Sequence, residues 1–284
     1  MNPIILVLPI LSLLMFDLGL TLRLDDFAML ARRPRAVLVG LTGQLIVLPV
    51  VAFALAAVMN LPALYFVGVV LIACCPGGSS SNVFSKLAGG DVALSVTLTA
   101  LSSVITLCTI PVVLGLAVSW SGTELGGGIH LPVGNLLMQN LVLMALPIVL
   151  GVVMKKFWPR AAQRTDAVLS RIAFPALMLL AGILFVQHYG EIVANIKQLG
   201  VCVMALILLA ILVAAGLARL ARLGGAVRRT IVIEVGMQNA AQAIAVASSP
   251  FIFNNDVIAI PAIIYALLMN VVLLIYVAVL RKHH

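Results

Sequence analysis

The sequence contains a series of long apolar segments, most of them close to 20 residues in length. A helix of about 20 residues crosses the roughly 30 Å hydrocarbon core of a membrane. We find nine such segments, near residues 3–22, 36–58, 62–82, 92–119, 135–154, 172–188, 200–218, 230–250 and 257–280. They lack the alternation of apolar and polar residues that membrane β-strands show, so they predict an all-α membrane protein with nine transmembrane helices.

The overall composition excludes a water-soluble domain. Hydrophobic residues make up 63% of the chain and charged residues only 9%, with a mean hydropathy of +1.24. Soluble domains carry about 25% charged residues, because most of their surface faces water. Most of the surface of a protein with so few charged residues must therefore face lipid, so the lipid bilayer is an expected partner.

The net charge of +8 reflects membrane topology rather than nucleic-acid binding. Of the 17 Lys and Arg residues, 16 follow the first, third, fifth, seventh and ninth segments, and only Lys197 lies on the other side. Basic residues collect in cytoplasmic loops. The pattern predicts a multi-pass protein of the cell membrane (plasma or bacterial inner membrane), with the N-terminus outside and the C-terminus in the cytoplasm. No nucleic-acid partner is expected.

Two segments contain residues that interrupt a membrane helix. Residues 75–82 in the third segment read CPGGSSSN, and residues 234–239 in the eighth read EVGMQN. Pro and Gly are common in membrane helices, and Ser or Asn can simply bond neighbouring helices together, so each motif alone has a purely structural reading. An intramembrane carboxylate such as Glu234 instead indicates a functional site.

The two interrupted segments occupy corresponding positions in two halves of the chain. By the charge pattern the third segment runs inward and the eighth runs outward, as in transporters built from inverted repeats. Segments one to four and six to nine would form the repeats. Broken helices expose N–H groups suited to a carboxylate and carbonyl groups suited to Na⁺.

Other membrane segments add polar side chains. Ser95 and Thr99 are spaced i, i+4 in the fourth segment and share one helix face, with Ser103 one turn further on. Gln44 is the one strongly polar residue inside the second segment. Oxygen ligands of these kinds match a hard cation. Ser and Thr can alternatively bond back to the carbonyl four residues earlier in their own helix.

At these residues the sequence resembles the bile acid:sodium symporter family over essentially the whole chain. The matching motifs are Pro-Gly-Gly-x-x-Ser-Asn at 76–82, Ala-Leu-Ser-Val at 93–96 and Glu-Val-Gly-Met-Gln-Asn at 234–239. The resemblance implies two Na⁺ ions as coupling ions, bound beside the point where the broken helices cross, and no other cofactor. It also implies a panel domain of helices near 3–22, 135–154 and 172–188. The remaining helices, near 36–119 and 200–280, would form a core domain within one transporter unit spanning residues 1–284.

The resemblance also implies site residues. One sodium site would use Ser81, Asn82, Ser95, Thr99 and Glu234. The other would use Gln44, Glu234, Gln238 and the backbone carbonyls of Val235 and Met237. Substrate would lie near Gly78, Ser79, Asn239 and Asn270.

The implied function is sodium-coupled uptake of a small organic anion by alternating access. Members of the family carry bile acids, steroid sulfates, pantoate or small keto acids, and the sequence does not choose among these substrates or fix the oligomeric state, for which a monomer is one option. Asp17 and Met269 depart from the family pattern. Asp17 would either reach the inner interface or face a cytoplasmic cavity.

A proton- or potential-driven efflux carrier of organic anions or metalloids, with a related fold, is the alternative. Cys74 and Cys75 could suggest a thiol site for a metalloid. Adjacent residues of a helix point about 100° apart, however, so they are poor joint ligands. No catalytic nucleophile–base pair is evident, and an enzyme is not expected.

Overall fold

The computed structural model describes residues 4–22, 31–78, 80–124, 134, 138, 141–187, 189–249, 252–253 and 255–282. Throughout these residues the regular structure is helical, and the one β-type contact is an isolated antiparallel bridge. The prediction of an all-α protein is therefore confirmed.

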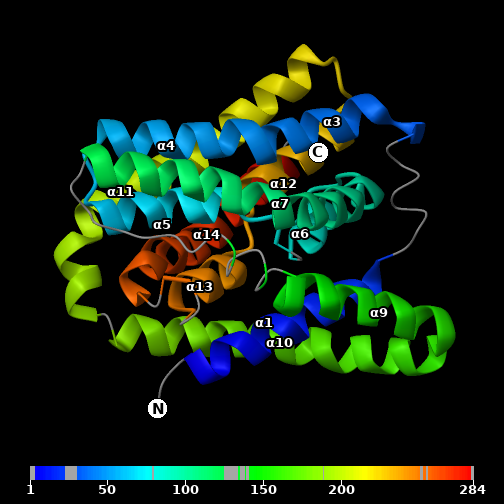
Figure 1. Ribbon diagram of the computed structural model, residues 1–284. Coiled ribbons are helices and arrows are strands. Elements are labelled where there is room, and N and C mark those ends of the chain that lie inside the picture. The colour runs from blue at the N-terminus through cyan, green and yellow to red at the C-terminus, as the bar shows by residue number, and fades with distance from the viewer. Residues whose placement is uncertain are drawn as a thin grey trace.

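Apart from residues 22–33 and 125–140, short connections join one helix to the next. The first half of the chain contains α1 (Ile4–Thr21), α3 (Pro34–Thr42), η1 (Gly43–Val47), α4 (Leu48–Val58), α5 (Ala63–Cys74), α6 (Ser81–Leu87) and α7 (Val92–Glu124). The second half contains η2 (Leu141–Ala145), α9 (Leu146–Phe157), α10 (Pro159–Gln187), α11 (Tyr189–Leu220), α12 (Gly225–Gly236), α13 (Ala240–Ser248), η3 (Asp256–Ala259) and α14 (Ile260–Lys282). Figure 1 shows α4, α5 and α10 running across the view, whereas the start of α11 climbs steeply at the left.

Several helices are suited to a membrane by length and composition. Within the described residues, four are long and apolar enough to cross it, namely 34–58, 92–122, 192–220 and 256–281. Two shorter apolar helices cover 8–21 and 63–74. The third and eighth predicted segments are each divided in two, which makes their pieces shorter than a span. The count of nine spans remains a prediction.

Helix boundaries differ from the predicted segments where charged residues begin a helix. The sixth segment was expected from residue 172, but α10 begins at Pro159, so Arg160 and Arg164 lie on the helix and not in a loop. α11 likewise begins at Tyr189 and carries Lys197. Hydropathy detects the apolar part of a helix, whereas the helix itself continues past the hydrocarbon region. Proline favours the first helical position, where its missing N–H removes no hydrogen bond.

The helices form two groups. α1, α9 and α10 pack on one another and lie along one edge of the molecule (Figure 1). Gly19 and Gly151 allow close approach of α1 and α9, because a Cβ on either glycine would overlap the backbone of the other helix. In the second group, α5 packs against α4, α7 and α14, and α11 packs against α12.

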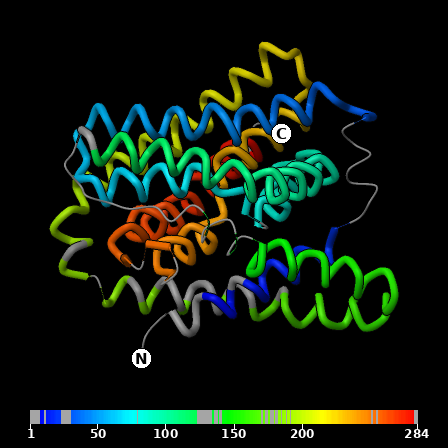
Figure 2. Tube along the Cα trace, in the orientation of Figure 1, coloured from blue at the N-terminus to red at the C-terminus, as the bar shows by residue number. Residues whose placement is uncertain are grey.

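The broken helices come together between these groups. Figure 2 shows the cyan trace of α5 and the orange trace of α13, the helices next to the two breaks, toward the middle of the molecule. α13 contacts both α14 and α1, so the second break lies where the two groups meet. This arrangement positions the polar residues described next.

Candidate functional site

Local sequence causes each break. Cys75 has extended backbone angles, φ −68° and ψ 157°, because the ring of Pro76 disfavours a helical conformation in the residue before it. Met237 is also extended, with φ −116° and ψ 97°, directly after Gly236. Both helices therefore stop inside the molecule and leave backbone polar groups without helical partners.

The two breaks satisfy each other's backbone groups. Gly77 and Gln238 form the isolated antiparallel bridge. The N–H of Gly78 donates to the carbonyl of Met237 at 2.9 Å. The N–H of Asn239 donates to the carbonyl of Pro76 at 2.8 Å. Irregular backbone within a membrane requires such partners, since lipid offers none. The segments that the sequence placed in corresponding halves thus cross in space.

Glu234 is the centre of a buried polar cluster beside this crossing. Its carboxylate accepts hydrogen bonds from the hydroxyl of Ser81 at 2.6 Å, from the hydroxyl of Thr99 at 3.0 Å and from the hydroxyl of Ser95. The residue is fully buried, and in the part of the chain that the structure describes no Lys, Arg or His forms an ion pair with it. A buried carboxylate without a positive partner is costly. The cluster therefore favours a bound cation.

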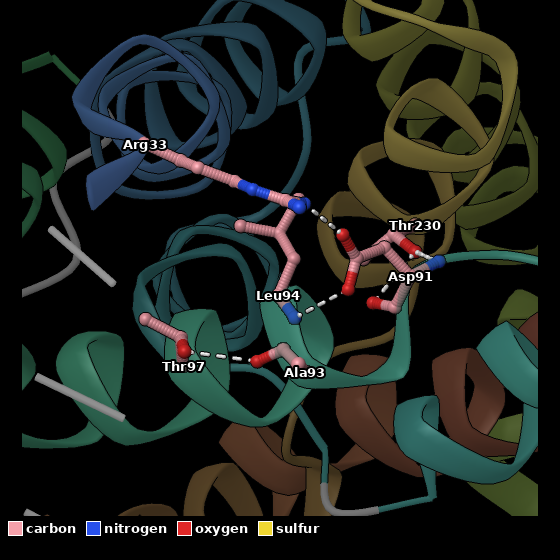
Figure 3. Close-up of polar contacts among 6 residues, drawn as sticks. All are labelled: Arg33, Asp91, Ala93, Leu94, Thr97 and Thr230. Atoms are coloured by element: carbon pink, nitrogen blue, oxygen red, sulfur yellow. Dashed lines mark hydrogen bonds and ion pairs between the residues drawn. The ribbon is translucent and has the colours of Figure 1, made fainter. Parts of the chain in front are cut away.

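Helix α7 presents its hydroxyl groups in two ways. Ser95 and Thr99 turn toward Glu234 instead of bonding to their own helix. Thr97 donates to the carbonyl of Ala93 at 2.9 Å (Figure 3), and Ser103 donates to the carbonyl of Thr99 at 2.7 Å. Thr97 and Ser103 therefore bond back to a carbonyl of their own helix, whereas Ser95 and Thr99 do not.

Gln44 joins the cluster from a π-helical turn. This turn, η1, interrupts the helix between α3 and α4. The side-chain amide donates to the backbone carbonyl of Glu234 at 3.4 Å, and the residue is buried. π-helical turns often occur at functional sites because they alter the direction of a side chain within a helix.

Buried oxygen atoms around Glu234 fit a cation. The side-chain carbonyl oxygens of Gln44, Asn82 and Gln238 are buried and have no hydrogen-bond partner among the described residues. Such atoms are costly unless a donor or a metal ion contacts them. Asn82 belongs to the first predicted sodium site, and the two glutamines belong to the second. The chemistry of the residues thus fits Na⁺ at both sites.

The two predicted backbone ligands already accept hydrogen bonds. The carbonyl of Val235 accepts from the amide of Gln238 at 2.9 Å, and that of Met237 accepts from the N–H of Gly78. A carbonyl has two lone pairs, so each retains capacity for an ion.

Gly77 allows the cluster to form at the crossing. A Cβ at this position would lie 2.6 Å from Oε2 of Glu234, 3.1 Å from Nε2 of Gln44 and 3.4 Å from the hydroxyl of Thr99. Only a residue without a side chain allows these groups to approach the backbone so closely. Gly77 thus lies between residues assigned to the two predicted ion sites.

A cavity of about 60 Å³ adjoins the crossing. Three of the predicted substrate residues line it, Gly78, Asn239 and Asn270. The fourth, Ser79, lies outside the described residues. The far wall is apolar and comes from α1, through Leu14, Met15 and Leu18. The cavity therefore lies between the two groups of helices.

Two asparagines present defined groups at this cavity. The side-chain oxygen of Asn239 caps α13 by accepting from the N–H of Gln242 at 3.1 Å. This contact does not use its NH₂ group, which can donate to a ligand. The NH₂ group of Asn270 donates to the carbonyl of Ala266 at 2.7 Å. This contact does not use the side-chain oxygen of Asn270, which can accept a hydrogen bond from a ligand.

Some residues of the site gave no signal in the sequence. The hydroxyl of Ser102 accepts the N–H of Gly77 at 3.3 Å, and the hydroxyl of Tyr265 donates to the carbonyl of Gly236 at 3.0 Å. Both groups stabilise the backbone at a break. Asp17 is half-buried and does not line the cavity described above.

Known proteins resemble this chain closely. The Sodium Bile acid symporter family matches residues 8–196. A sodium-dependent transporter of Bacillus subtilis, YocS, is 34% identical over 270 residues, which cover 92% of this chain and 78% of the relative. A probable chloroplastic sodium/metabolite cotransporter of Arabidopsis thaliana, BASS1, is 31% identical over 252 residues, covering 88% of this chain and 60% of the relative.

A human relative is more distant. The ileal sodium/bile acid cotransporter is 29% identical over 240 residues, covering 81% of this chain and 65% of its own length. The family match over most of the chain agrees with the broken-helix motifs and the oxygen-rich cluster. The chain thus belongs to the sodium bile acid symporter family, a family of transporters and not of enzymes.

Proposed function

We propose that this protein is a sodium-coupled symporter that takes up a small organic anion by alternating access. The observation that carries the proposal is Glu234, a buried carboxylate at the crossing of two broken helices, surrounded by unpartnered amide oxygens and by hydroxyl groups. A buried negative charge with hard oxygen neighbours favours binding of a hard cation. The sodium-dependent relatives support the choice of Na⁺.

Two ions would share Glu234. The first would lie among the hydroxyl groups of Ser81, Ser95 and Thr99, with the amide oxygen of Asn82. The second would lie on the other side of Gly77, among the amide oxygens of Gln44 and Gln238 and the carbonyls of Val235 and Met237. Each position has at least one buried oxygen that accepts no hydrogen bond from the residues that the structure describes, which supports a separate ion at each.

The organic anion would bind in the adjoining cavity. Ser80, Asn239, Ala240 and Ala241 line it, so the N-terminal ends of α6 and α13 face it. Helix N-termini carry free N–H groups and partial positive charge, which favour a carboxylate. A cavity of about 60 Å³ holds only several water molecules, since one water needs about 10–15 Å³. The size favours a small carboxylate over a steroid-sized anion.

Transport would require relative movement of two domains. The panel domain would contain α1, η2–α9 and α10, and the core domain would contain the other helices, within a nine-span unit of two inverted repeats. The α1 wall of the cavity belongs to the panel, whereas the residues proposed to bind ions belong to the core. A shift of one against the other would therefore open the cavity to either side.

The charge distribution supports an orientation in the cell membrane with the C-terminus in the cytoplasm. Cysteines introduced after Met1 and before Arg281 should react with an impermeant thiol reagent from opposite sides of the membrane. Reaction of both from the same side would contradict this orientation.

The function is tested by the thermal stability of the purified protein in Na⁺ or K⁺, with a panel of carboxylates. A ligand present at 100 times its dissociation constant stabilises the folded state by about 2.7 kcal/mol. We expect stabilisation by Na⁺, and further stabilisation by the transported carboxylate only when Na⁺ is present. Equal stability in Na⁺ and K⁺, with a carboxylate effect that follows pH, would instead support the proton-driven efflux carrier.

A further inference from the structure

Thr230 lies one helical turn before Glu234 on α12 and belongs to neither of the proposed ion sites. The residue is fully buried. The spacing of i, i+4 puts Thr230 and Glu234 on one face of the helix, about 6 Å apart along its axis. The face that carries the proposed sodium ligand therefore also carries a hydroxyl group nearer the beginning of α12.

The hydroxyl of Thr230 makes a paired contact with the backbone of Asp91, the residue directly before α7 (Figure 3). It accepts the N–H of Asp91 at 2.8 Å and donates to the carbonyl of Asp91 at 3.1 Å. A hydroxyl has one donor and two acceptor sites, so it can make both bonds at once. The pair therefore fixes the backbone at the start of α7 relative to α12.

The carbonyl of Asp91 that binds Thr230 also binds the next turn of α7. It accepts the backbone N–H of Ser95 at 3.1 Å. The hydroxyl of Ser95 in turn donates to the carboxylate of Glu234. α7 and α12 are therefore connected at two levels one helical turn apart, by Asp91 with Thr230 and by Ser95 with Glu234.

The side chain of Asp91 holds the start of α7 in two further ways. One carboxylate oxygen accepts the N–H of Leu94 at 3.1 Å, as the side chain of an N-cap residue does. The other pairs with the guanidinium of Arg33, the residue directly before α3, at 2.6 Å (Figure 3). The start of α7 is thus fixed relative to both α3 and α12.

Gly90 allows Thr230 to approach this turn. A Cβ on Gly90 would lie 2.6 Å from the hydroxyl oxygen of Thr230 and 3.0 Å from the carbonyl oxygen of Ser85. The N–H of Gly90 donates to that carbonyl at 2.7 Å, and the hydroxyl of Ser85 donates to that of Ser95 at 3.2 Å. The turn between α6 and α7 therefore packs directly against Thr230 and also contacts a proposed sodium ligand.

We propose that Thr230 is a positioning residue for the first sodium site and sets the alignment of α7 along α12. The inference rests on the proposed sodium site, because Thr230 acts through its ligands. Ser95 and Thr99 lie one and two turns after Asp91, and both donate to Glu234. O–H···O bonds span only about 2.5–3.0 Å, so a small slip of α7 along α12 would break these contacts.

The main test is a double-mutant cycle on sodium affinity, measured from the melting temperature of the purified protein as Na⁺ replaces K⁺. Thr230→Val removes the hydroxyl and keeps the shape of the side chain, so the apparent affinity for Na⁺ should fall about 5- to 10-fold. In a Ser95→Ala background the same substitution should change the affinity by no more than about 2-fold, because the hydroxyl that it displaces is already absent. An equal loss in both backgrounds would overturn the proposal.

Two matched variants separate positioning from the general cost of losing a buried hydroxyl. Thr97→Val removes a fully buried hydroxyl of α7 that bonds only within its own helix among the described residues, and it should keep wild-type sodium affinity. Thr230→Ser keeps the hydroxyl and should restore the affinity to within about 2-fold of the wild type. Wild-type affinity in Thr230→Val, or equal losses in Thr230→Val and Thr97→Val, would overturn the positioning role.

The ratio of Na⁺ to Li⁺ affinity provides a second readout. Selectivity between cations of equal charge depends on the size and rigidity of the ligand cage. Displaced ligands should therefore shift this ratio by at least about 2-fold in Thr230→Val and leave it unchanged in Thr97→Val. An unchanged ratio in Thr230→Val, with a lower melting temperature in K⁺, would show a purely structural role. If Na⁺ fails to stabilise even the wild type, the proposed sodium sites are wrong and this inference is wrong with them.

Discussion

Replacement of Gly77 by alanine is expected to disrupt sodium binding while leaving the fold intact. The added methyl group would lie 2.6 Å from Oε2 of Glu234, whereas ordinary van der Waals contact begins near 3.4 Å. The carboxylate must therefore retreat by about 0.8 Å. It is the end of a flexible side chain, so it can move, but movement weakens the hydroxyl contacts that fix it.

The expected loss of sodium affinity in Gly77→Ala follows from these contacts. Thr99 donates to the same oxygen, Oε2, at 3.0 Å, and a retreat of that size can lengthen this bond beyond hydrogen-bonding distance. A hydrogen bond to a charged group contributes about 1.5–3 kcal/mol. The apparent affinity for Na⁺ should therefore fall by about 10- to 150-fold.

Sodium-dependent melting of purified Gly77→Ala measures this loss. Gly216→Ala is the matched control, because a Cβ on Gly216 in α11 would meet no atom within 4 Å. The control should keep wild-type sodium affinity, and both variants should melt cooperatively in K⁺. A wild-type response to Na⁺ in Gly77→Ala would show that the carboxylate near Gly77 does not bind the ion.

Three further predictions follow from the cavity, the ion count and α1. Asn239→Ser keeps an acceptor that can cap α13 but removes the NH₂ group. The substrate concentration for half-maximal uptake should therefore rise about 5- to 10-fold, with Na⁺-induced stabilisation unchanged. An unchanged concentration for half-maximal uptake would remove Asn239 from the substrate site. Two Na⁺ with one monocarboxylate carry one net positive charge, and moving this charge through a membrane potential of 100 mV is worth about 2.3 kcal/mol. Uptake into proteoliposomes should therefore be faster with the inside negative. Equal rates at opposite potentials would contradict that stoichiometry. Asp17→Asn should keep wild-type substrate preference and pH profile, because Asp17 does not line the cavity; altered preference would place it on the substrate path.

The residues of the polar cluster are conspicuous in the sequence, because membrane helices contain few polar residues. Gln44 and Glu234 are isolated among apolar neighbours, and Pro76 with two glycines indicates a break. Burying such residues in the hydrocarbon region costs free energy, so they occur there mainly where function requires them. The structure brings these residues together at one crossing.

Other parts depend on contacts between distant segments and had no local signal. Helical spacing from Thr99 pointed to Ser103, yet Ser103 bonds to its own helix and Ser102 contacts the break. The pairing of Gly77 with Gln238 depends on how distant helices pack, for example α12 against α6 and α7, which neither motif specifies. The early start of α10 at Pro159 was missed because hydropathy is insensitive to the charged end of a helix.

The most direct test of the central claim is Na⁺ binding by Glu234→Ala. Removing this carboxylate would leave two cations among neutral ligands in a region of low dielectric, where the loss of a balancing charge is severe. Melting temperature and uptake should be measured for the wild type and the variant in Na⁺ and in K⁺. We expect Na⁺ to stabilise the wild type and drive its uptake, and the variant to remain folded in the membrane but lose both responses. A variant with wild-type stabilisation by Na⁺ and sodium-dependent uptake would contradict it.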